Sequence, residues 1–339
     1  MELVYFDWEL SLSFLSGLQM QILFITSSRV GDAILTTGIL KHLVDHHQMA
    51  KFTIACGPVA QGLFDNVPGL EAIITMRKGS LLEHWRKLYF STFLKRWDLV
   101  VDLRGSAIAW FLPAKRRVIY KKKNKKIHRV EDMKNVLKSN TPHPPYIWLS
   151  EENKKFADDI LGKRMAQPLI VIGPTANWDA KIWEADRFSN LVHLLTSNFH
   201  SLQSAIIAVV GGPGEELIAK PILDAIPFGK RIDLVGAIPF LDVAAVLERA
   251  TLYVGNDSGL MHLSAAVGAP TLGLFGPTRE ANYGPWGSRC AYVRTSESFE
   301  QLSRHPDFRP DPTNSLMGGL SVETVLNACG ELLRETGRN

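Results

Sequence analysis

The feature that most constrains the fold is an alternation of short apolar runs with amphipathic stretches along most of the chain. Residues 21–26 (QILFIT) form such a run, a tight polar loop follows, and residues 33–44 place their apolar side chains on one helical face. Further strands are predicted over residues 52–55, 72–76 and 99–103, with helical stretches between them. Strands that alternate with helices predict a parallel sheet covered on both faces.

The alternation starts again after a proline-rich polar segment, residues 139–146 (SNTPHPPY), which is predicted to be a linker. Strands are then predicted over residues 169–173, 205–210, 252–254 and 271–275. Helices are predicted over residues 183–195, 215–226, 241–249, 258–267 and 322–335, and residues 298–314 look irregular. A chain of 339 residues with this pattern predicts two doubly wound α/β domains. Ligands are expected in the cleft between them, outside the carboxyl ends of the strands.

Residues 1–19 are apolar and aromatic, but Glu2, Asp7 and Glu9 interrupt them and no basic segment precedes them. This pattern does not fit a secretory signal. The stretch also has too few consecutive apolar residues to cross a bilayer. We interpret residues 1–19 as a leader or a mis-assigned start, followed by a first domain over 20–149 and a second over 150–320. Three widely spaced cysteines fit neither a disulfide framework nor a zinc site and favour a reducing cytoplasm.

A dense basic run lies in the first domain, with nine Lys or Arg residues and no acid between Lys115 and Arg129. Such a run attracts phosphates, acidic glycolipids, membrane surfaces or nucleic acid, although a solvated loop is the simpler alternative. Lys121, Lys122 and Lys123 are therefore candidates for binding an anionic acceptor. No nucleic-acid-binding motif accompanies the run, so nucleic acid is not an expected partner.

The segment most informative for chemistry is residues 252–270 (LYVGNDSGLMHLSAAVGAP), in which a β-rich run ends in Gly-Asn-Asp and a helix begins at Ser-Gly. Small residues let a ligand approach the backbone closely. The first N–H groups of a helix have no partners within it, and the helix dipole is positive at this end. These properties predict a phosphate site. A plain helix cap by Asp257 or Ser258 is the alternative.

Two further segments fall between a predicted strand and a predicted helix. Lys181, in residues 173–183, is expected near the domain cleft, where its ammonium group could neutralise a diphosphate leaving group. Asp32, in residues 27–32, is expected to face the cleft as an ionised carboxylate that accepts a proton from an attacking hydroxyl. The alternatives are an ordinary surface lysine and an ordinary helix cap.

Several motifs are absent from the sequence. There is no GxGxxG after the first strand, which disfavours an NAD-dependent oxidoreductase, and there is no GxxxxGK[ST] phosphate loop. No Asp-x-Asp occurs, so a metal–diphosphate clamp of that kind is missing. His42, His46 and His47 lie close together on a predicted helix with Asp45 among them. A polar helix face explains them more simply than a metal site, and no metal site is predicted.

Taken together, three stretches resemble glycosyltransferase family 9, the ADP-heptose:lipopolysaccharide heptosyltransferases. They are residues 29–40 (RVGDAILTTGIL), 173–188 (GPTANWDAKIWEADRF) and 254–278 (VGNDSGLMHLSAAVGAPTLGLFGPT). The resemblance covers residues 20–333 and implies a GT-B architecture of two Rossmann-like domains, with the donor held mainly by the second. It also implies an inverting, metal-independent transfer without a cofactor, and a final helix, residues 321–339, that crosses back to the first domain.

By the same resemblance, Asp32 corresponds to the family's general base and Lys181 to its phosphate-binding lysine. The donor-binding positions that it implies are Ala176, Asn177, Glu215, Ile238, Asp257, Ser258, Gly259, Leu260 and His262. Arg29 joins the three lysines of the basic run as a candidate for the acceptor or another anion. Residues 316–317 are Leu-Met where members of the family often carry Cys-Met.

The partners that the resemblance implies are a nucleotide-sugar donor, with ADP-heptose as the family default, and the anionic inner core of lipopolysaccharide as acceptor. A cytoplasmic enzyme in peripheral contact with the inner membrane fits these partners. Two alternatives stay open at this point. One is another GT-B enzyme such as a nucleotide-sugar epimerase, which would act without an acceptor. The other is a non-catalytic sugar-nucleotide-binding protein on the same fold, which would tolerate loss of Asp32.

Overall fold

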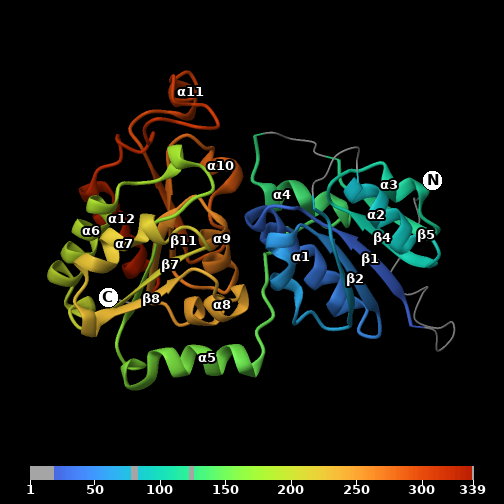
Figure 1. The fold of residues 1–339 in the computed structure, drawn as a ribbon, viewed down its shortest axis with the longest axis horizontal. Helices are drawn as coiled ribbons and strands as arrows, with labels where there is room; N and C mark the ends of the chain where they lie inside the picture. The colour runs from blue at the N-terminus through green and yellow to red at the C-terminus, as the bar shows by residue number, and fades with distance from the viewer. Residues whose placement is uncertain (1–18, 78–82, 122–125, 338–339) are drawn as a thin grey trace, which may run out of the picture.

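The structure, a computed structural model, describes residues 19–77, 83–121 and 126–337. It contains two parallel β-sheets, each with helices on both faces, and the two resulting domains lie side by side (Figure 1). The predicted α/β fold of two doubly wound domains is therefore confirmed. Most of the predicted leader, together with Lys122 and Lys123, lies outside the described residues.

The first sheet has the strand order β3-β2-β1-β4-β5, and all its neighbouring strands are parallel. Its strands are β1 (Gln21–Ile25), β2 (Lys51–Cys56), β3 (Leu70–Thr75), β4 (Trp97–Asp102) and β5 (Ala114–Ile119). The helices of this domain are α1 (Val30–His46), η1 (Pro58–Phe64), α2 (Glu83–Thr92), α3 (Ile108–Phe111), α4 (Arg129–Met133) and η3 (Lys134–Val136).

The second sheet has six parallel strands in the order β11-β10-β9-β6-β7-β8. They are β6 (Leu169–Gly173), β7 (Ile206–Gly211), β8 (Arg231–Val235), β9 (Leu252–Asn256), β10 (Thr271–Phe275) and β11 (Cys290–Arg294). The longer helices around it are α6 (Ala185–Asn198), α7 (Glu216–Ala225), α8 (Phe240–Glu248), α9 (Gly259–Ala266) and α12 (Val322–Glu335). The short ones are η4 (Gly162–Arg164), η5 (Asp179–Lys181), η6 (His200–Leu202), η7 (Phe228–Lys230), α10 (Glu280–Tyr283) and α11 (Phe299–Leu302).

Three strands that the sequence analysis does not predict, β5, β8 and β11, all lie at the edges of the sheets. An edge strand has one neighbour, so it stays partly exposed and carries charged residues instead of a continuous apolar run. β5 (AKRRVI) illustrates this, because its two central arginines belong to the basic run. The basic run is therefore not a loop throughout: its first part is an ordered edge strand.

Among the described residues, three large hydrophobic cores fill the spaces between sheets and helices, and a small fourth cluster contains Ala180, Leu302 and Leu316. One lies between the first sheet and α2 and α3, and another lies between the second sheet and α6, α7 and α12. The largest core is continuous across both domains, from β1 and α1 to α8 and α9. Helix α1 is apolar on several sides, because it packs on the first sheet and also against α9 of the second domain.

The last helix, α12, packs on the second domain, in contact with α6, β10 and β11. Its apolar side is buried in the core of that domain, through Val325, Cys329, Leu332 and Leu333. The expectation that the final helix crosses back to the first domain is therefore wrong, because its apolar face is already covered by the second sheet. A different helix, α5 (Glu151–Leu161), follows the linker and packs on α8 below the second domain (Figure 1).

Polar contacts also join the domains on two sides. At the start of α5, the Asn66 side chain donates to Asn153 Oδ1 (2.8 Å), and Asn153 Nδ2 donates to Asp242 Oδ1 (2.7 Å). These three residues come from the first domain, α5 and α8. Just before α4, His128 Nε2 lies 2.9 Å from the Gly284 carbonyl oxygen, and Asn282 donates to the Ile127 carbonyl oxygen (2.7 Å). The domains thus enclose a space between the carboxyl ends of their strands.

Candidate active site

Two helices begin at the face where the domains meet. Helix α1 follows β1, and α9 follows β9, so both start at the carboxyl end of a central strand. Their N-cap residues are Arg29 and Ser258, and neither side chain bonds to the first turn of its helix. The alternative of a capping side chain at Ser258 is therefore not what the structure shows. Backbone N–H groups and two positive helix ends are available to an anion here.

Two glycines allow the helix starts to approach each other. A Cβ atom on Gly31 would lie 2.9 Å from His262 Cδ2, and a Cβ atom on Gly259 would lie 3.0 Å from Val30 Cγ1. Both distances are tighter than ordinary van der Waals contact. Gly31 and Gly259 are thus needed for the close contact of α1 with α9, and any larger side chain would separate the two halves of the site.

The ammonium group of Lys181 reaches the start of α9 from η5. Its Nζ donates to the Asp257 carbonyl oxygen (2.7 Å) and lies 3.3 Å from Asp257 Oδ2, and both side chains are largely buried. An ammonium has three N–H donors, and these bonds use two of them. Lys181 is therefore a held, buried cation beside the helix start and not an ordinary surface lysine.

Asn256, the last residue of β9, is a buried residue that the sequence analysis missed. Its Oδ1 accepts a hydrogen bond from the Trp183 backbone (3.2 Å), and its Nδ2 donates to the Pro174 carbonyl oxygen (2.7 Å). These bonds tie the segment that carries Lys181 to the end of β9. A buried polar side chain must find such partners, so an Asn that ends an apolar run could have indicated this role.

The loop after β7 presents a carboxylate to the same cavity. Glu215 Oε2 accepts a hydrogen bond from the Gly212 backbone N–H (2.6 Å), which holds the glycine-rich turn closed. Ile238 lies in the next loop, after Gly236, whose φ of +108° favours glycine. The two loops bring Glu215 and Ile238 into the lining of the same cavity as Asp32, although Asp32 is far from both in the sequence.

His262, in the first turns of α9, is buried and lies against Gly31. Burial lowers its pKa to about 4, and the negative charge of Asp257 opposes this shift. The imidazole is therefore neutral at neutral pH. Its Nδ1 atom is buried and has no hydrogen-bond partner within the described structure.

On the first domain, Asp32 is half-buried in the first turn of α1 and Arg29 is exposed. Tyr283 of α10, from the second domain, faces them. Burial raises the pKa of Tyr283, and the charge of Asp32 acts in the same direction. The sequence analysis missed Tyr283, because α10 is a four-residue helix in an irregular stretch and nothing local indicates what it faces.

One interdomain cavity of about 1100 Å³ brings these groups together. It is lined by both residues proposed for catalysis, by all nine proposed for the donor, and by Arg29, as follows: Arg29, Asp32, Ala176, Asn177, Lys181, Glu215, Ile238, Asp257, Ser258, Gly259, Leu260 and His262. Residues that the sequence analysis missed also line it, among them Asn66, Asn153, Thr175, Asp242 and Tyr283. Lys121 is exposed and does not line this cavity.

Over the ranges 19–77, 83–121 and 126–337, no group of three or more His, Cys, Asp or Glu side chains is placed to hold a metal ion. His42 and His46 stack on each other with ring centroids 3.9 Å apart, on the face of α1 beneath the linker. In the same ranges, no helix combines the length and apolar character that crossing a membrane would require.

Comparison with known proteins agrees with this fold and identifies a family. The sequence profile of glycosyltransferase family 9 (heptosyltransferase) matches residues 97–308. Lipooligosaccharide heptosyltransferase 2 of Haemophilus influenzae is 23% identical over 93% of this chain and 99% of its own length.

Two solved structures share the fold. The family 9 glycosyltransferase of Veillonella parvula has a TM-score of 0.76 at 21% identity, over 94% of this chain and 99% of that one. The ADP-heptose lipopolysaccharide heptosyltransferase II of Escherichia coli has a TM-score of 0.72 at 19% identity, over 94% of this chain and 100% of that one. The profile match covers more than half of the chain, and the chain therefore belongs to glycosyltransferase family 9, the heptosyltransferases.

Proposed function

We propose that this glycosyltransferase transfers a heptose from ADP-heptose to an anionic inner-core lipopolysaccharide acceptor in the cytoplasm, by a single inverting displacement. The observation that carries the proposal is one cavity that joins Asp32 of the first domain to Lys181 and the start of α9 in the second. The substrates named for the Escherichia coli and Haemophilus influenzae relatives support the choice of donor and acceptor.

We place the diphosphate of the donor at the start of α9. There the N–H groups of Ser258, Gly259 and Leu260 and the positive end of the helix favour an anion. Lys181 lies beside them with one N–H group not used by Asp257. Ala176 and Asn177 border the phosphates on the side of β6. Asp257 holds Lys181 beside the helix start, and His262 lies in the first turns of the same helix.

The nucleoside is placed against the loops after β7 and β8. The carboxylate of Glu215 accepts hydrogen bonds from the ribose hydroxyls, and Ile238 provides an apolar surface for the base. Glu215 keeps one oxygen on Gly212, which fixes its orientation before the donor arrives. Preorganisation of this kind reduces the entropy lost on binding.

In the proposed reaction, an acceptor hydroxyl attacks the anomeric carbon of the heptose from the side of the first domain. The bond from that carbon to the diphosphate oxygen breaks, and the configuration at the carbon inverts. Asp32 takes the hydroxyl proton, and the nucleoside diphosphate leaves with its charge spread over Lys181 and the α9 amides. These groups supply the leaving-group stabilisation, so we propose a metal-independent transfer.

The acceptor is placed on the open side of the cavity formed by the first domain. Arg29 lies close to Asp32 at this side. Lys121 follows β5, so it lies at the same carboxyl ends of the strands. Lys122 and Lys123, which lie outside the described residues, continue the basic run. Cations at this edge attract the phosphates of an inner-core glycolipid before the sugar enters the cavity.

The test is the Asp32→Asn variant, assayed with ADP-heptose and a truncated lipopolysaccharide acceptor. We expect turnover to fall by about 10²–10⁴, because the base is lost, while donor affinity changes little. Asp45→Asn is the matched control, since Asp45 lies on the same helix and pairs with Lys41 outside the cavity. NMR of the product reports the anomeric configuration, and assays with a chelator report on metal dependence.

Three results would contradict parts of the proposal. Unchanged turnover in Asp32→Asn would show that Asp32 is not the general base. Isomerisation of the donor without any acceptor would favour an epimerase. Donor binding without turnover on any acceptor, unaffected by Asp32→Asn, would favour a non-catalytic binding protein.

A further inference from the structure

A fully buried tyrosine of the second sheet points toward the start of α9. Tyr253, in β9, is 0% exposed and pairs with Val171 of the neighbouring strand β6. Two residues further along, Gly255 pairs with Gly173 on the same face of the sheet. A Cβ atom on Gly255 would lie 2.5 Å from the Tyr253 hydroxyl oxygen, and one on Gly173 would lie closer still. The two glycines therefore leave the space in which this hydroxyl group reaches the carboxyl ends of the strands.

The Tyr253 hydroxyl oxygen has no hydrogen-bond partner in the part of the chain that the structure describes. Burial raises the pKa of this phenol, the nearby Ser258 hydroxyl opposes the shift, and the negative charge of Glu215 adds to it. The phenol therefore keeps its proton and is a hydrogen-bond donor at neutral pH. A buried donor without an acceptor lowers the stability of a fold, so its presence requires a physical reason.

The Ser258 side chain beside it is also unsatisfied. Ser258 is the N-cap residue of α9, a position at which a serine hydroxyl usually accepts a hydrogen bond from the first turn. Here its Oγ atom is buried and has no partner within the described ranges, the Tyr253 hydroxyl included. Ser258 lines the cavity, whereas Tyr253 does not. Of the two hydroxyl groups, only that of Ser258 can therefore meet a ligand directly.

Further unsatisfied polar atoms lie around the start of α9. His262 Nδ1, in the same helix, and Thr278 Oγ1, after β10, are buried without a hydrogen-bond partner among residues 19–77, 83–121 and 126–337. Both residues line the cavity. Buried polar atoms in a folded protein are normally paired. Several unpaired ones at a helix start, where backbone N–H groups also lack partners, indicate that a polar ligand completes the bonding here.

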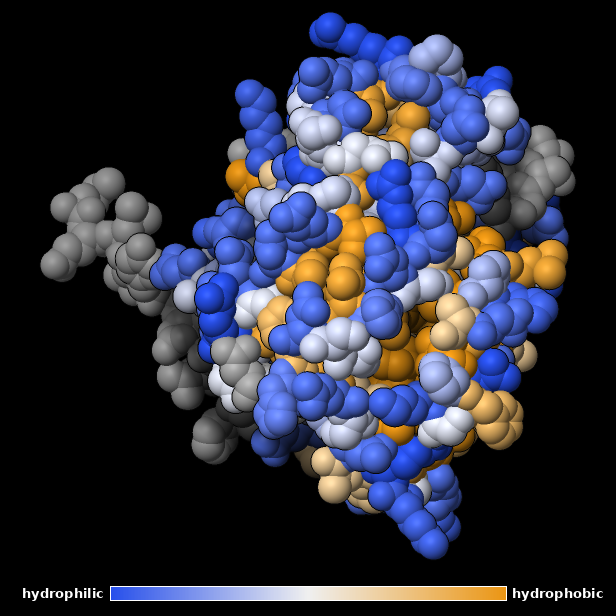
Figure 2. Space-filling model, turned by 90° about the vertical axis from the view of Figure 1, so that its left-hand side faces the viewer, coloured by the Kyte–Doolittle hydropathy of each residue, from blue (hydrophilic) through white to orange (hydrophobic). Residues whose placement is uncertain are grey.

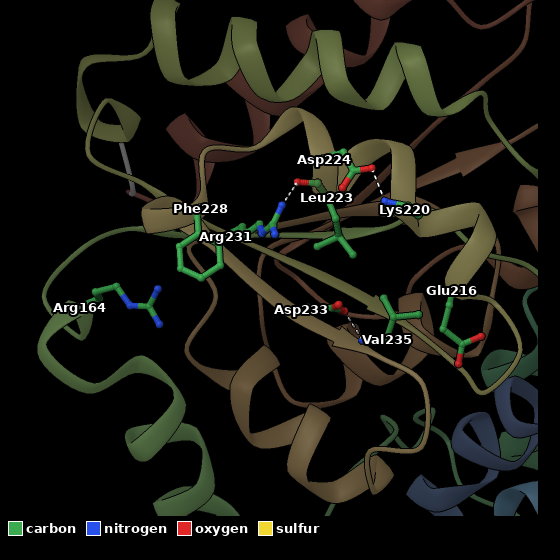
Figure 3. Close-up of a pocket in the computed structure, with 9 residues that line it drawn as sticks. All are labelled: Arg164, Glu216, Lys220, Leu223, Asp224, Phe228, Arg231, Asp233 and Val235. Carbon is green, nitrogen blue, oxygen red and sulfur yellow. Dashed lines mark hydrogen bonds and ion pairs between the residues drawn. The ribbon is translucent and has the colours of Figure 1, made fainter.

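A pocket elsewhere on the second domain lacks this feature. The outer end of the domain, seen in Figure 2, has apolar patches broken by polar residues. In the pocket beside the edge strand β8, several charged side chains bond to their neighbours (Figure 3). Lys220 pairs with Asp224 at 2.6 Å. Arg231 donates to the Leu223 carbonyl oxygen (3.0 Å). Within the described ranges, no residue that lines this pocket has a buried atom without a partner.

We propose that Tyr253 is a positioning residue for the donor diphosphate and that it acts through Ser258. When a phosphate oxygen reaches the start of α9, the Tyr253 hydroxyl donates to Ser258 Oγ, and the Ser258 hydroxyl donates to the phosphate. Each hydroxyl group then has a partner, and the bond to the charged phosphate is the stronger of the two. The identity of the anion rests on the proposed function, whereas the pair of unsatisfied hydroxyl groups does not.

The first variant is Tyr253→Phe, which removes only the hydroxyl group. Without a ligand, its unfolding midpoint should rise by about 1–3 °C, because a buried donor without a partner is lost. Its affinity for ADP should nevertheless fall by about two- to tenfold in calorimetric titration, because the Ser258 proton is no longer directed to the phosphate. The affinity for adenosine, which has no phosphate, should not change. A residue that only fills the core would not move stability and ADP affinity in opposite directions.

A second variant, Ser258→Ala, tests the route from the tyrosine to the phosphate. Its ADP affinity should fall by about tenfold or more, because a hydrogen bond to a charged group is lost. Adding Tyr253→Phe to Ser258→Ala should cause no further loss, since the tyrosine acts only through the serine. Tyr292→Phe is the matched control, because it makes the same chemical change on the edge strand β11, where Tyr292 is 51% exposed. It should bind ADP as the wild type does.

Unchanged ADP affinity in Tyr253→Phe would overturn this inference and leave the proposed function standing. Equal losses for ADP and adenosine would also overturn it, because Tyr253 would then support the nucleotide site as a whole. A lower unfolding midpoint would show that the hydroxyl group already has a partner, and additive losses in the double variant would show that it does not act through Ser258. Absence of ADP binding to the wild type would instead contradict the proposed function, and with it the diphosphate as the anion.

Discussion

The carboxyl ends of the two sheets face one cavity but are built differently. At the second sheet, Asn256, Asp257 and His262 are buried, and the bonds of Asn256 and Lys181 hold the loops together before any ligand is present. At the first sheet, Arg29 is exposed and Asp32 is half-buried. Under the proposed function, the difference fits two tasks: a fixed site for a small donor, and an open side for a bulky acceptor.

This comparison also says where substitutions should act most strongly. A preorganised site loses both stability and chemistry when one of its buried partners is removed, because the remaining partner is left unsatisfied. When one exposed charged residue is replaced, the surface loses only part of its attraction for an anionic ligand, because solvent already screens that attraction. The donor side should therefore be sensitive to single changes, and the acceptor side, apart from the proposed base Asp32, tolerant of them.

After loss of the proposed base, the largest effect in this comparison is expected for Lys181→Ala. Loss of the ammonium removes charge stabilisation of the leaving diphosphate, so kcat should fall by about 10²–10³, and donor affinity should fall as well. Steady-state kinetics and calorimetric titration with the donor measure both effects. Lys181→Arg should restore part of the activity, and thermal unfolding separates catalysis from stability. Wild-type kinetics in Lys181→Ala would show that the helix start alone holds the diphosphate.

An intermediate effect is expected from pH. Because the pKa of His262 is lowered to about 4 in the folded state, below its ordinary value of 6.5, the unfolded chain binds a proton first as the pH falls. Stability should thus be lost between about pH 6.5 and pH 4, with about 3 kcal/mol as the upper bound for this residue. His262→Gln should flatten the stability profile in denaturant unfolding across this range.

His42 provides the control for that measurement, because burial lowers its pKa to about 4 as well and it lies on α1 outside the cavity. His42→Gln should also flatten the stability profile, but it should leave the pH dependence of donor affinity unchanged. His262→Gln should alter both. Identical donor-binding profiles for the two variants would mean that His262 is only a buried core residue.

The smallest effect is expected on the open side, for Lys121→Glu. The acceptor KM should rise by about two- to tenfold, more than the donor KM, and the rise should shrink at high salt because the charge is exposed. Lys163→Glu, an equally exposed change on the second domain, is the matched control. Acceptor kinetics that match those of the control would show that this part of the basic run is only a solvated segment without a role in acceptor binding.

Much of the donor side could be predicted from the sequence, because its residues lie in short local segments. A strand that ends in Gly-Asn-Asp and passes into a helix at Ser258 indicates an anion site without knowledge of the fold. Strands in the middle of the sheets were also predicted, since both of their faces are buried and their residues are continuously apolar. The edge strand β5 was not, because exposure lets it carry arginines.

Long-range partners could not be predicted in the same way. Nothing near Asn256 in the sequence shows that it bonds to Trp183 and Pro174, more than 70 residues away. Tyr283 comes within the electrostatic influence of Asp32 only because the two domains meet at one cavity. Helix α12 stays on the second domain because its apolar face is buried in the core there.

By itself, the sequence determined the alternation of strands and helices, the two-domain class, and the turns that carry Asp32, Lys181 and Ser258. These depend on periodicity and on backbone groups close in the chain, which act before the chain is folded. Only the tertiary structure decided which strands form the edges and which buried side chains join the loops. Those outcomes depend on burial, and burial is a property of the whole packed molecule.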